Sequence, residues 1–235
     1  MKLLGIDTTS NVATVAIFED DKCIGEMMLN HPKTHSQKMM PLIDALMNAL
    51  ELEIKDLDGI AISAGPGSFT GVRIGMATAK ALAHASGLPL YSISALEAMA
   101  YNVPAYNGLV CPIMDARRDQ VYTAVFEFTG QKVERTLEDA SLSISELIAE
   151  LKKSSHSVLF LGDGIVRFKE TIVNELGDRA LFAPDHLRMQ KASSVCYAIS
   201  QKADEIKQTG YSEVVPNYLR KSQAEREYDE KRKGL

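Results

Sequence analysis

Short apolar runs and longer segments of helical periodicity alternate along the first half of the chain. The runs contain many β-branched residues and are separated by polar turns such as EDDK, which is typical of strands in a sheet. Their order predicts three strands, a helix, a strand and a helix, at residues 2–8, 11–18, 22–29, 36–50, 58–64 and 70–86. The first half is therefore predicted to be a βββαβα unit.

The second half repeats this order. We predict three strands, a helix, a strand and a helical segment, at residues 109–115, 120–128, 132–137, 144–153, 157–162 and near 165–175. An ungapped alignment of the halves gives the pairs Asp7 and Asp115, Ala16 and Ala124, Ile17 and Val125, and Phe18 and Phe126. The segments Gly65-Pro66-Gly67 and Gly162-Asp163-Gly164 then follow equivalent strands. The two halves are therefore predicted to be duplicates.

Two facing βββαβα units are the arrangement of the actin-like fold, which sugar kinases and heat-shock ATPases share. The fold class is accordingly predicted to be α/β with two subdomains. We place the N-terminal subdomain at residues 1–103, the C-terminal subdomain at 104–220 and a charged tail at 221–235. In this fold, the turn after the first strand of each half reaches toward the phosphates of a nucleotide.

Those two turns contain Asp7 and Thr8 in the first half, and Asp115 and Arg117 in the second. An aspartate there can orient a metal-bound water, and backbone N–H groups can hold phosphate oxygens. Neither turn has the glycine that lets a backbone approach a phosphate closely. We interpret these four residues as a vestigial nucleotide cleft. The alternative, an ATPase or small-molecule kinase of this fold with a retained cleft, stays open.

The densest glycine cluster is GPGSFTG, at residues 65–71. A dinucleotide-binding fingerprint needs GxGxxG, but here the third glycine comes one residue late. A P-loop needs a lysine directly after its last glycine, but Val72 follows Gly71. What remains is the N-terminus of a helix that Ser68 or Thr70 can cap. The spacing therefore excludes both phosphate-binding templates.

Both long helices of the first half have more apolar surface than one sheet contact requires. Glycine in a helix interior costs about 0.5–1 kcal/mol relative to alanine, so close approach of another helix is expected to offset the glycines at 70–86. The predicted partner surface comprises Met39, Met40, Ile43, Leu46, Met47, Leu50, Gly71, Arg73, Gly75 and Ala79. The alternative, that both helices pack on one internal core, stays open.

Composition limits the function and the location. Hydrophobic residues make up 46% and charged residues 24% of the 235, which is typical of a globular protein. The net charge of −5, without a basic stretch, indicates that this chain does not hold nucleic acid by itself. Its apolar runs are too short for a membrane span or a signal peptide. With three scattered cysteines interpreted as reduced thiols, we predict a cytoplasmic protein.

No catalytic residue, cofactor or metal site is predicted. His31 and His35 have HxxxH spacing, but Pro32 interrupts the interval and no nearby acid supplies a third ligand. The serines lack a GxSxG context, so a hydrolytic triad is not expected.

Several motifs carry a resemblance to a known family: LLGIDTTSNVATVAI, HSQKMMPLIDAL, AISAGPGSFTGVRIGMATAKALA, PLYSISALEAMA, DARRDQVYTAVF, GDG and PNYLR. In this order they resemble the TsaB (YeaZ) family from residue 2 to about residue 220. The most specific part is GPGSFTGVRIG followed by DARRDQVY.

The resemblance implies a non-catalytic scaffold and dimerization subunit of the complex that forms threonylcarbamoyladenosine next to the anticodon in tRNAs. Such a subunit is expected to bind and activate a catalytic paralogue, TsaD, together with the ATPase TsaE. It is expected to form a homodimer when alone, to meet tRNA only through the complex, and to need no membrane.

With this resemblance, the helices at 36–50 and 70–86 are expected to form the helix-bundle face shared with TsaD or with a second copy. We expect Gly75→Leu to separate that contact while the monomer stays folded.

Overall fold

A computed structural model describes residues 1–31, 35–130, 132–202, 210–220 and 232. The first half contains β1 (Lys2–Asp7), β2 (Val12–Glu19), β3 (Lys22–Asn30), α1 (His35–Ala49), β4 (Gly59–Ser63), α2 (Phe69–Ser86), β5 (Leu90–Ile93) and α3 (Ala95–Ala100). The second half contains β6 (Leu109–Asp115), β7 (Gln120–Thr129), β8 (Lys132–Ser143), α4 (Ile144–Leu151), β9 (Val158–Leu161), α5 (Gly164–Leu176), β10 (Ala180–Phe182) and α6 (Ala192–Gln201).

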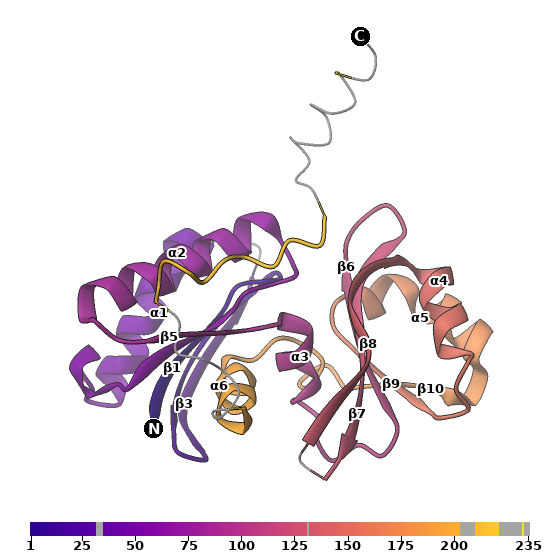
Figure 1. The fold of residues 1–235 in the computed structure, drawn as a ribbon, viewed down its shortest axis with the longest axis horizontal. Coiled ribbons are helices and arrows are strands. Elements are labelled where there is room, and N and C mark those ends of the chain that lie inside the picture. The colour runs from indigo at the N-terminus through magenta and orange to yellow at the C-terminus, as the bar shows by residue number, and fades with distance from the viewer. Residues whose placement is uncertain (32–34, 131, 203–209, 221–231, 233–235) are drawn as a thin grey trace.

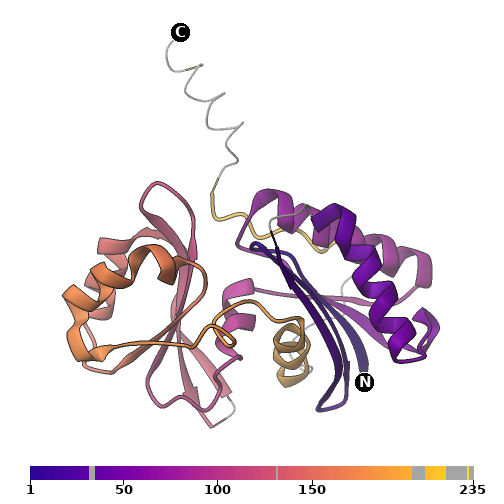
Figure 2. The same ribbon diagram turned by 180° about the vertical axis from the view of Figure 1, so that it is seen from behind.

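Within the described ranges, the strands form two five-stranded sheets of equivalent order (Figure 1). The first runs β3-β2-β1-β4-β5, and the second runs β8-β7-β6-β9-β10. In each half, the first strand pairs antiparallel with the second and parallel with the fourth. This equivalence confirms the predicted α/β class and the duplicated, actin-like arrangement in two subdomains. Figure 2 shows the two subdomains from behind.

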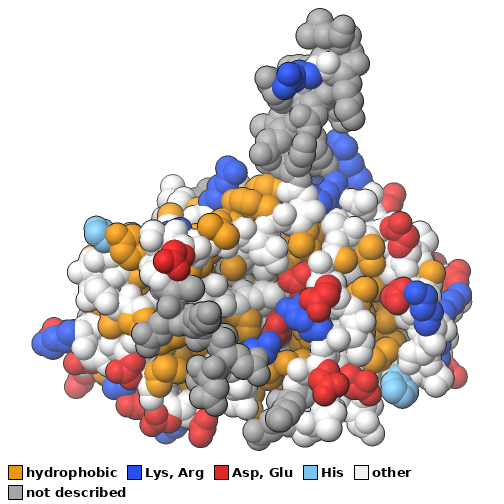
Figure 3. All heavy atoms as spheres, viewed as in Figure 1, with side chains coloured by type: hydrophobic (Ala, Val, Ile, Leu, Met, Phe, Trp, Pro, Cys, Tyr) orange, Lys and Arg blue, Asp and Glu red, His pale blue; other side chains and the backbone are white. Residues whose placement is uncertain are grey.

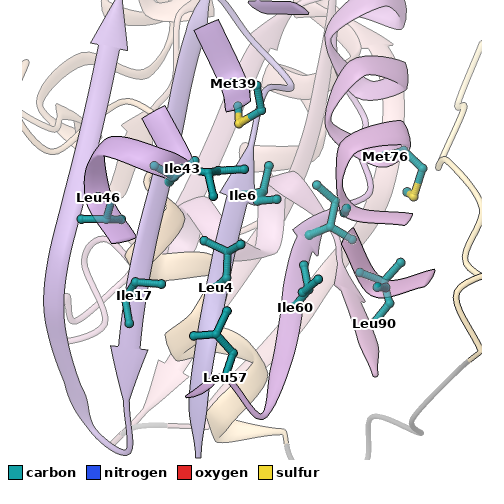
Figure 4. Close-up of a cluster of buried hydrophobic side chains, with 14 of the residues drawn as sticks. Leu4, Ile6, Ile17, Met39, Ile43, Leu46, Leu57, Ile60, Met76 and Leu90 are labelled. Carbon is teal, nitrogen blue, oxygen red and sulfur yellow. The ribbon is translucent and has the colours of Figure 1, made fainter. Parts of the chain in front are cut away.

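Side chains of β1 alternate between the two faces of the first sheet. Leu4 and Ile6 belong to a core cluster beneath α1 and α2, and Met39, Ile43 and Leu46 of α1 belong to the same cluster (Figure 4). On the opposite face, Leu3 packs in a second cluster with side chains of α6. Since β1 is buried on both faces, its residues read as a nearly continuous apolar run.

The last helix of each half packs on the sheet of the other half. Helix α3 contacts β6 and β7, and α6 contacts β1 and β2. Gly5 permits the approach of α6, because a Cβ at this position would lie 2.6 Å from the carbonyl oxygen of Ala192. The boundary drawn between residues 103 and 104 falls in the α3–β6 connection, and it stays a prediction.

The twelve predicted elements all occur, with ends that differ by a few residues. The largest difference is β8, which continues to Ser143, whereas the predicted strand ends at residue 137. The pattern of the sequence does not predict β5, α3, β10 or α6. The charged tail predicted at 221–235 lies outside the described residues, apart from Arg232.

The glycines that follow the fourth strand of each half have equivalent conformations. Gly65 has a φ of +100° and Gly162 a φ of +97°, in the region that favours glycine. Gly67 and Gly164 lie against the carbonyl oxygens of Thr9 and Ile113, respectively, at the end of each half's first strand or in the loop after it. The similar φ angles of Gly65 and Gly162 therefore agree with the alignment of these two turns, whereas the contacts of Gly67 and Gly164 are made at different positions of the two halves.

Candidate functional site: the central cleft and the outer face of the first helices

A cavity of about 540 Å³, called here the central cleft, lies between the two halves. It occupies the position where the sequence predicts a nucleotide cleft. Among its lining residues are Thr9, Ser10, Ser68, Thr70, Asp115, Arg117, Asp163 and Arg220. Of the four predicted cleft residues, Asp115 and Arg117 line it, whereas Asp7 and Thr8 do not.

Asp7, at the end of β1, is only 1% exposed. Its Oδ1 accepts hydrogen bonds from the backbone N–H and the hydroxyl of Thr9, at 2.8 and 2.7 Å. Its Oδ2 makes no hydrogen bond of ordinary geometry among the described residues, although the hydroxyl of Ser63 lies close enough to lower the pKa of the carboxyl group in part. Desolvation raises the pKa of Asp7, although the N–H and hydroxyl of Thr9 lower it in part. Asp7 therefore has no oxygen accessible for holding a metal-bound water in the central cleft.

Thr8 explains the small side chains of α2. Its hydroxyl donates a 2.7 Å hydrogen bond to the carbonyl of Gly71. A Cβ on Gly71 would overlap the carbonyl oxygen of Thr8, and a Cβ on Gly75 would overlap the Thr8 hydroxyl. The expectation that these glycines admit a partner helix is therefore wrong, because the close approach comes from the β1–β2 loop of the same chain. For the same reason, Gly75→Leu would disturb the monomer itself.

The second loop of the central cleft has a strained backbone. Arg117, Arg118 and Asp119 all have positive φ, of 62°, 53° and 57°. The Asp115 carboxylate accepts a 2.8 Å hydrogen bond from the N–H of Arg117, which ties the loop to the end of β6. Three consecutive non-glycine residues in this region are costly, at about 1 kcal/mol or more each.

Asp163 is a cleft residue that the predicted site omits. Desolvation raises the pKa of its carboxyl group, and the nearby charge of Asp115 raises it further. Its Oδ1 accepts a 3.1 Å hydrogen bond from the N–H of Asp115. The internal alignment contained a signal for this residue, because Gly162-Asp163-Gly164 matches the loop that precedes α2.

Most of the predicted partner surface is inside the monomer. Met40 and Arg73 are exposed and Leu50 is partly exposed. The other members are buried: Met39, Ile43, Leu46, Met47, Gly71, Gly75 and Ala79. We define the outer helix face as the residues of α1 and α2 that are exposed instead, which include Met40, Ala45, Ala49, Arg73, Ala77 and Ala81.

Residues 210–220, the C-terminal segment, run beside α2 (Figures 1 and 2). Tyr218 stacks on Phe69 with ring centroids 4.7 Å apart, and its hydroxyl accepts a 2.9 Å hydrogen bond from Arg73 Nε. Val214 is buried in the core cluster of the first half. This segment therefore borders the outer helix face, and hydrophobic side chains are visible along the upper edge of the molecule where it lies (Figure 3).

Comparison with known proteins identifies the family. The model of the family described as "TsaD: tRNA N6-adenosine threonylcarbamoyltransferase" matches residues 30–228. A Bacillus subtilis protein named tRNA threonylcarbamoyladenosine biosynthesis protein TsaB is 32% identical over 233 residues, which cover 99% of this chain and 100% of that protein. The chain belongs to the TsaB family. An Escherichia coli protein of the same name is 34% identical over 129 residues, covering 54% of this chain and 55% of that protein.

Solved structures of the TsaB (YeaZ) family have the same fold. A Pseudomonas aeruginosa protein described as YeaZ superposes with a TM-score of 0.76 at 21% identity, covering 93% of this chain and 99% of that one. A second P. aeruginosa structure, described as similar to peptidase YEAZ, gives a TM-score of 0.79 at 23% identity with the same coverage. At these identities the likeness shows the fold alone.

The described part of this TsaB-family chain has no group of three or more His, Cys, Asp or Glu side chains placed to hold a metal ion. Nor does it contain a helix long and apolar enough to cross a bilayer. His31 and His35 lie beside a separate cavity of about 260 Å³, and His35 Nε2 is 2.8 Å from the carbonyl oxygen of Ser10.

Proposed function

We propose that this chain is a non-catalytic subunit of the machinery that forms threonylcarbamoyladenosine in tRNA. It binds and activates the catalytic subunit TsaD, acts together with the ATPase TsaE, and pairs with a second copy of itself when TsaD is absent. Membership of the TsaB family supports the pathway. The observation that supports a non-catalytic role is the burial of Asp7, whose carboxylate has no access to the central cleft.

The outer helix face is the proposed contact with TsaD. Its exposed alanines are spaced four apart, at Ala45 and Ala49 on α1 and at Ala77 and Ala81 on α2. Residues four apart lie on the same side of a helix, and small side chains there let another helix approach closely. The net charge of −5 supports the further proposal that tRNA is held by another subunit.

If the outer helix face contacts TsaD, larger and charged side chains on the exposed side of α2 should abolish TsaD binding. With Ala77→Arg and Ala81→Arg combined, we expect TsaD to stop copurifying with this chain, because two long side chains would keep the helices apart. Both positions are exposed, so the circular dichroism spectrum should be unchanged. The matched control is Ala149→Arg on α4, also exposed, which should copurify as the wild type does. Copurification of the double variant at the wild-type level would disprove this surface.

The open central cleft keeps one alternative testable, that of an ATPase or small-molecule kinase. Titration calorimetry with ATP and magnesium tests this alternative on the isolated chain. We expect no ATP hydrolysis, whether or not the nucleotide binds. Turnover that is lost in Asp7→Asn would overturn the proposal of a non-catalytic subunit, and it would not bear on the outer helix face.

A further inference from the structure

A cluster of four charged side chains lies where the two halves meet. Glu97 of α3 is 3% exposed, and its Oε2 accepts hydrogen bonds from Arg135 of β8 at 2.5 and 3.2 Å. Its other oxygen, Oε1, pairs with the ammonium group of Lys202, directly after α6. Arg135 also donates a 2.5 Å hydrogen bond to Asp139 on its own strand. Two carboxylates therefore face two cations in the cluster, and the exposed carboxylate of Glu138 lies 3.7 Å from Arg135 at its edge.

The hydrogen bonds that Arg135 and Asp139 of β8 make to Glu97 and Ser94 join the two halves of the molecule. Arg135 and Asp139 belong to the edge strand of the second sheet, whereas Glu97 belongs to α3 of the first half. Asp139 Oδ2 accepts a 2.5 Å hydrogen bond from the hydroxyl of Ser94, the residue that caps α3. Charged side chains of both signs are visible between the halves in Figure 3.

The C-terminal segment connects the same cluster to the mouth of the central cleft. Asn217 Nδ2 donates a 3.2 Å hydrogen bond to Asp139 Oδ2, and its backbone N–H donates to the carbonyl of Ala64, after β4, at 2.7 Å. Arg220 then donates a 2.7 Å hydrogen bond to the carbonyl of Ala116 in the β6–β7 loop. The segment is therefore bonded to both halves.

We propose that these contacts form a clamp, made of Glu97, Arg135, Asp139, Lys202 and the C-terminal segment, that holds the two halves at one angle. A paired charge cluster is specific in geometry, because any rotation of one half would leave buried charges without partners. The exchange of α3 and α6 between the sheets adds apolar contacts to the same boundary. The clamp fixes the width of the central cleft, which goes beyond the proposed subunit role and does not depend on it.

The clamp can be tested by measuring the distance between the halves with spin labels. One label goes on the exposed native Cys23 of β3 and the other on an introduced cysteine, Asn174→Cys, on the exposed side of α5; Cys111 and Cys196 are buried. Labelled chain is diluted with unlabelled chain, so that only distances within one molecule are measured. We expect a single narrow distance distribution for the wild type.

Arg135→Met removes the central charge of the clamp but keeps most of the side-chain volume. We expect this variant to lose the single narrow distribution and to populate additional distances. The matched control is Lys152→Met, because Lys152 pairs with Glu175 inside the second half, and its distribution should equal that of the wild type. An Arg135→Met variant with native circular dichroism and an unchanged distribution would overturn the proposal, as would a broad distribution in the wild type.

If Arg135→Met does not fold, a second pair of substitutions decides the question. Asn217→Ala combined with Arg220→Ala removes the side-chain hydrogen bonds of the C-terminal segment to the second half, at partly exposed positions. We expect its distance distribution to broaden relative to the wild type. A distribution identical to that of the wild type would overturn the proposed clamp, because the C-terminal segment is part of it.

Discussion

Replacing Gly71 by alanine is expected to lower the free energy of unfolding by about 3 kcal/mol, at the upper end of the usual cost of overpacking. The new Cβ would overlap the carbonyl oxygen of Thr8. This oxygen has little freedom to move, because the Thr8 hydroxyl is bonded to the Gly71 carbonyl and the Thr9 carbonyl accepts a 2.7 Å hydrogen bond from Ser68 N–H. Urea denaturation of the two proteins measures the difference.

The direction of the change in stability is informative, because replacing glycine by alanine in a helix interior normally stabilises the protein. The control is Ala77→Gly on the exposed side of α2, which should cost only about 1 kcal/mol through helix propensity. If Gly71→Ala were as stable as the wild type or more so, the β1–β2 loop would not pack against α2 as the structure has it.

The same position shows how far the sequence could lead. A repeat of small residues every four positions correctly indicates a helix face that something approaches closely. It does not say whether the neighbour is a partner helix or the chain's own loop, because both need the same missing side chains. Only the placement of Thr8 over Gly71 and Gly75 decides between them.

The duplication was more accessible to sequence reasoning than the exchange of helices. Alternating apolar residues and turns define β1 and β2, and their counterparts β6 and β7, because these are local patterns. Helix α3 has only six residues, all buried, so it has no polar face that would give a helical period. Strand β10 has three residues, too few for a recognisable pattern.

The site was partly predictable for a related reason. Asp115 is the exposed last residue of β6 and Arg117 lies in the loop after it, and both line the central cleft as expected. Asp7 is the last residue of the equivalent strand, β1, but it is buried, because the three residues after it are covered by α2, by the loop before α2 and by Gln190. Burial by segments that are distant in the sequence cannot be predicted from the residues next to Asp7.

The burial of Asp7 leads to the second large expected effect. Asp7→Asn should raise the free energy of unfolding at pH 7 by about 1–2 kcal/mol, because burying a neutral amide costs less than burying a charged carboxylate. An asparagine Oδ1 can accept the two hydrogen bonds from Thr9 that the carboxylate accepts now. Its uncharged amide nitrogen would replace Oδ2 beside the hydroxyl of Ser63, whose oxygen can accept a hydrogen bond from it. Thermal or urea unfolding of both proteins across pH tests this.

The pH dependence follows from the direction of the pKa shift. Burial raises the pKa of Asp7 in the folded protein above its ordinary value of 3.8, which applies to the unfolded chain. At a pH between the pKa of the unfolded chain and that of the folded protein, the folded protein therefore holds a proton that the unfolded chain has lost. The stability of the wild type should therefore fall as pH rises through this window, and that of Asp7→Asn should lack this component. The advantage of Asp7→Asn should accordingly shrink toward low pH. Asp44→Asn, on the exposed side of α1, serves as the control for the exchange of residue type, and its stability at pH 7 should be within about 0.5 kcal/mol of the wild type. Equal stability of Asp7→Asn and the wild type at pH 7 would mean that the buried carboxylate carries no net cost.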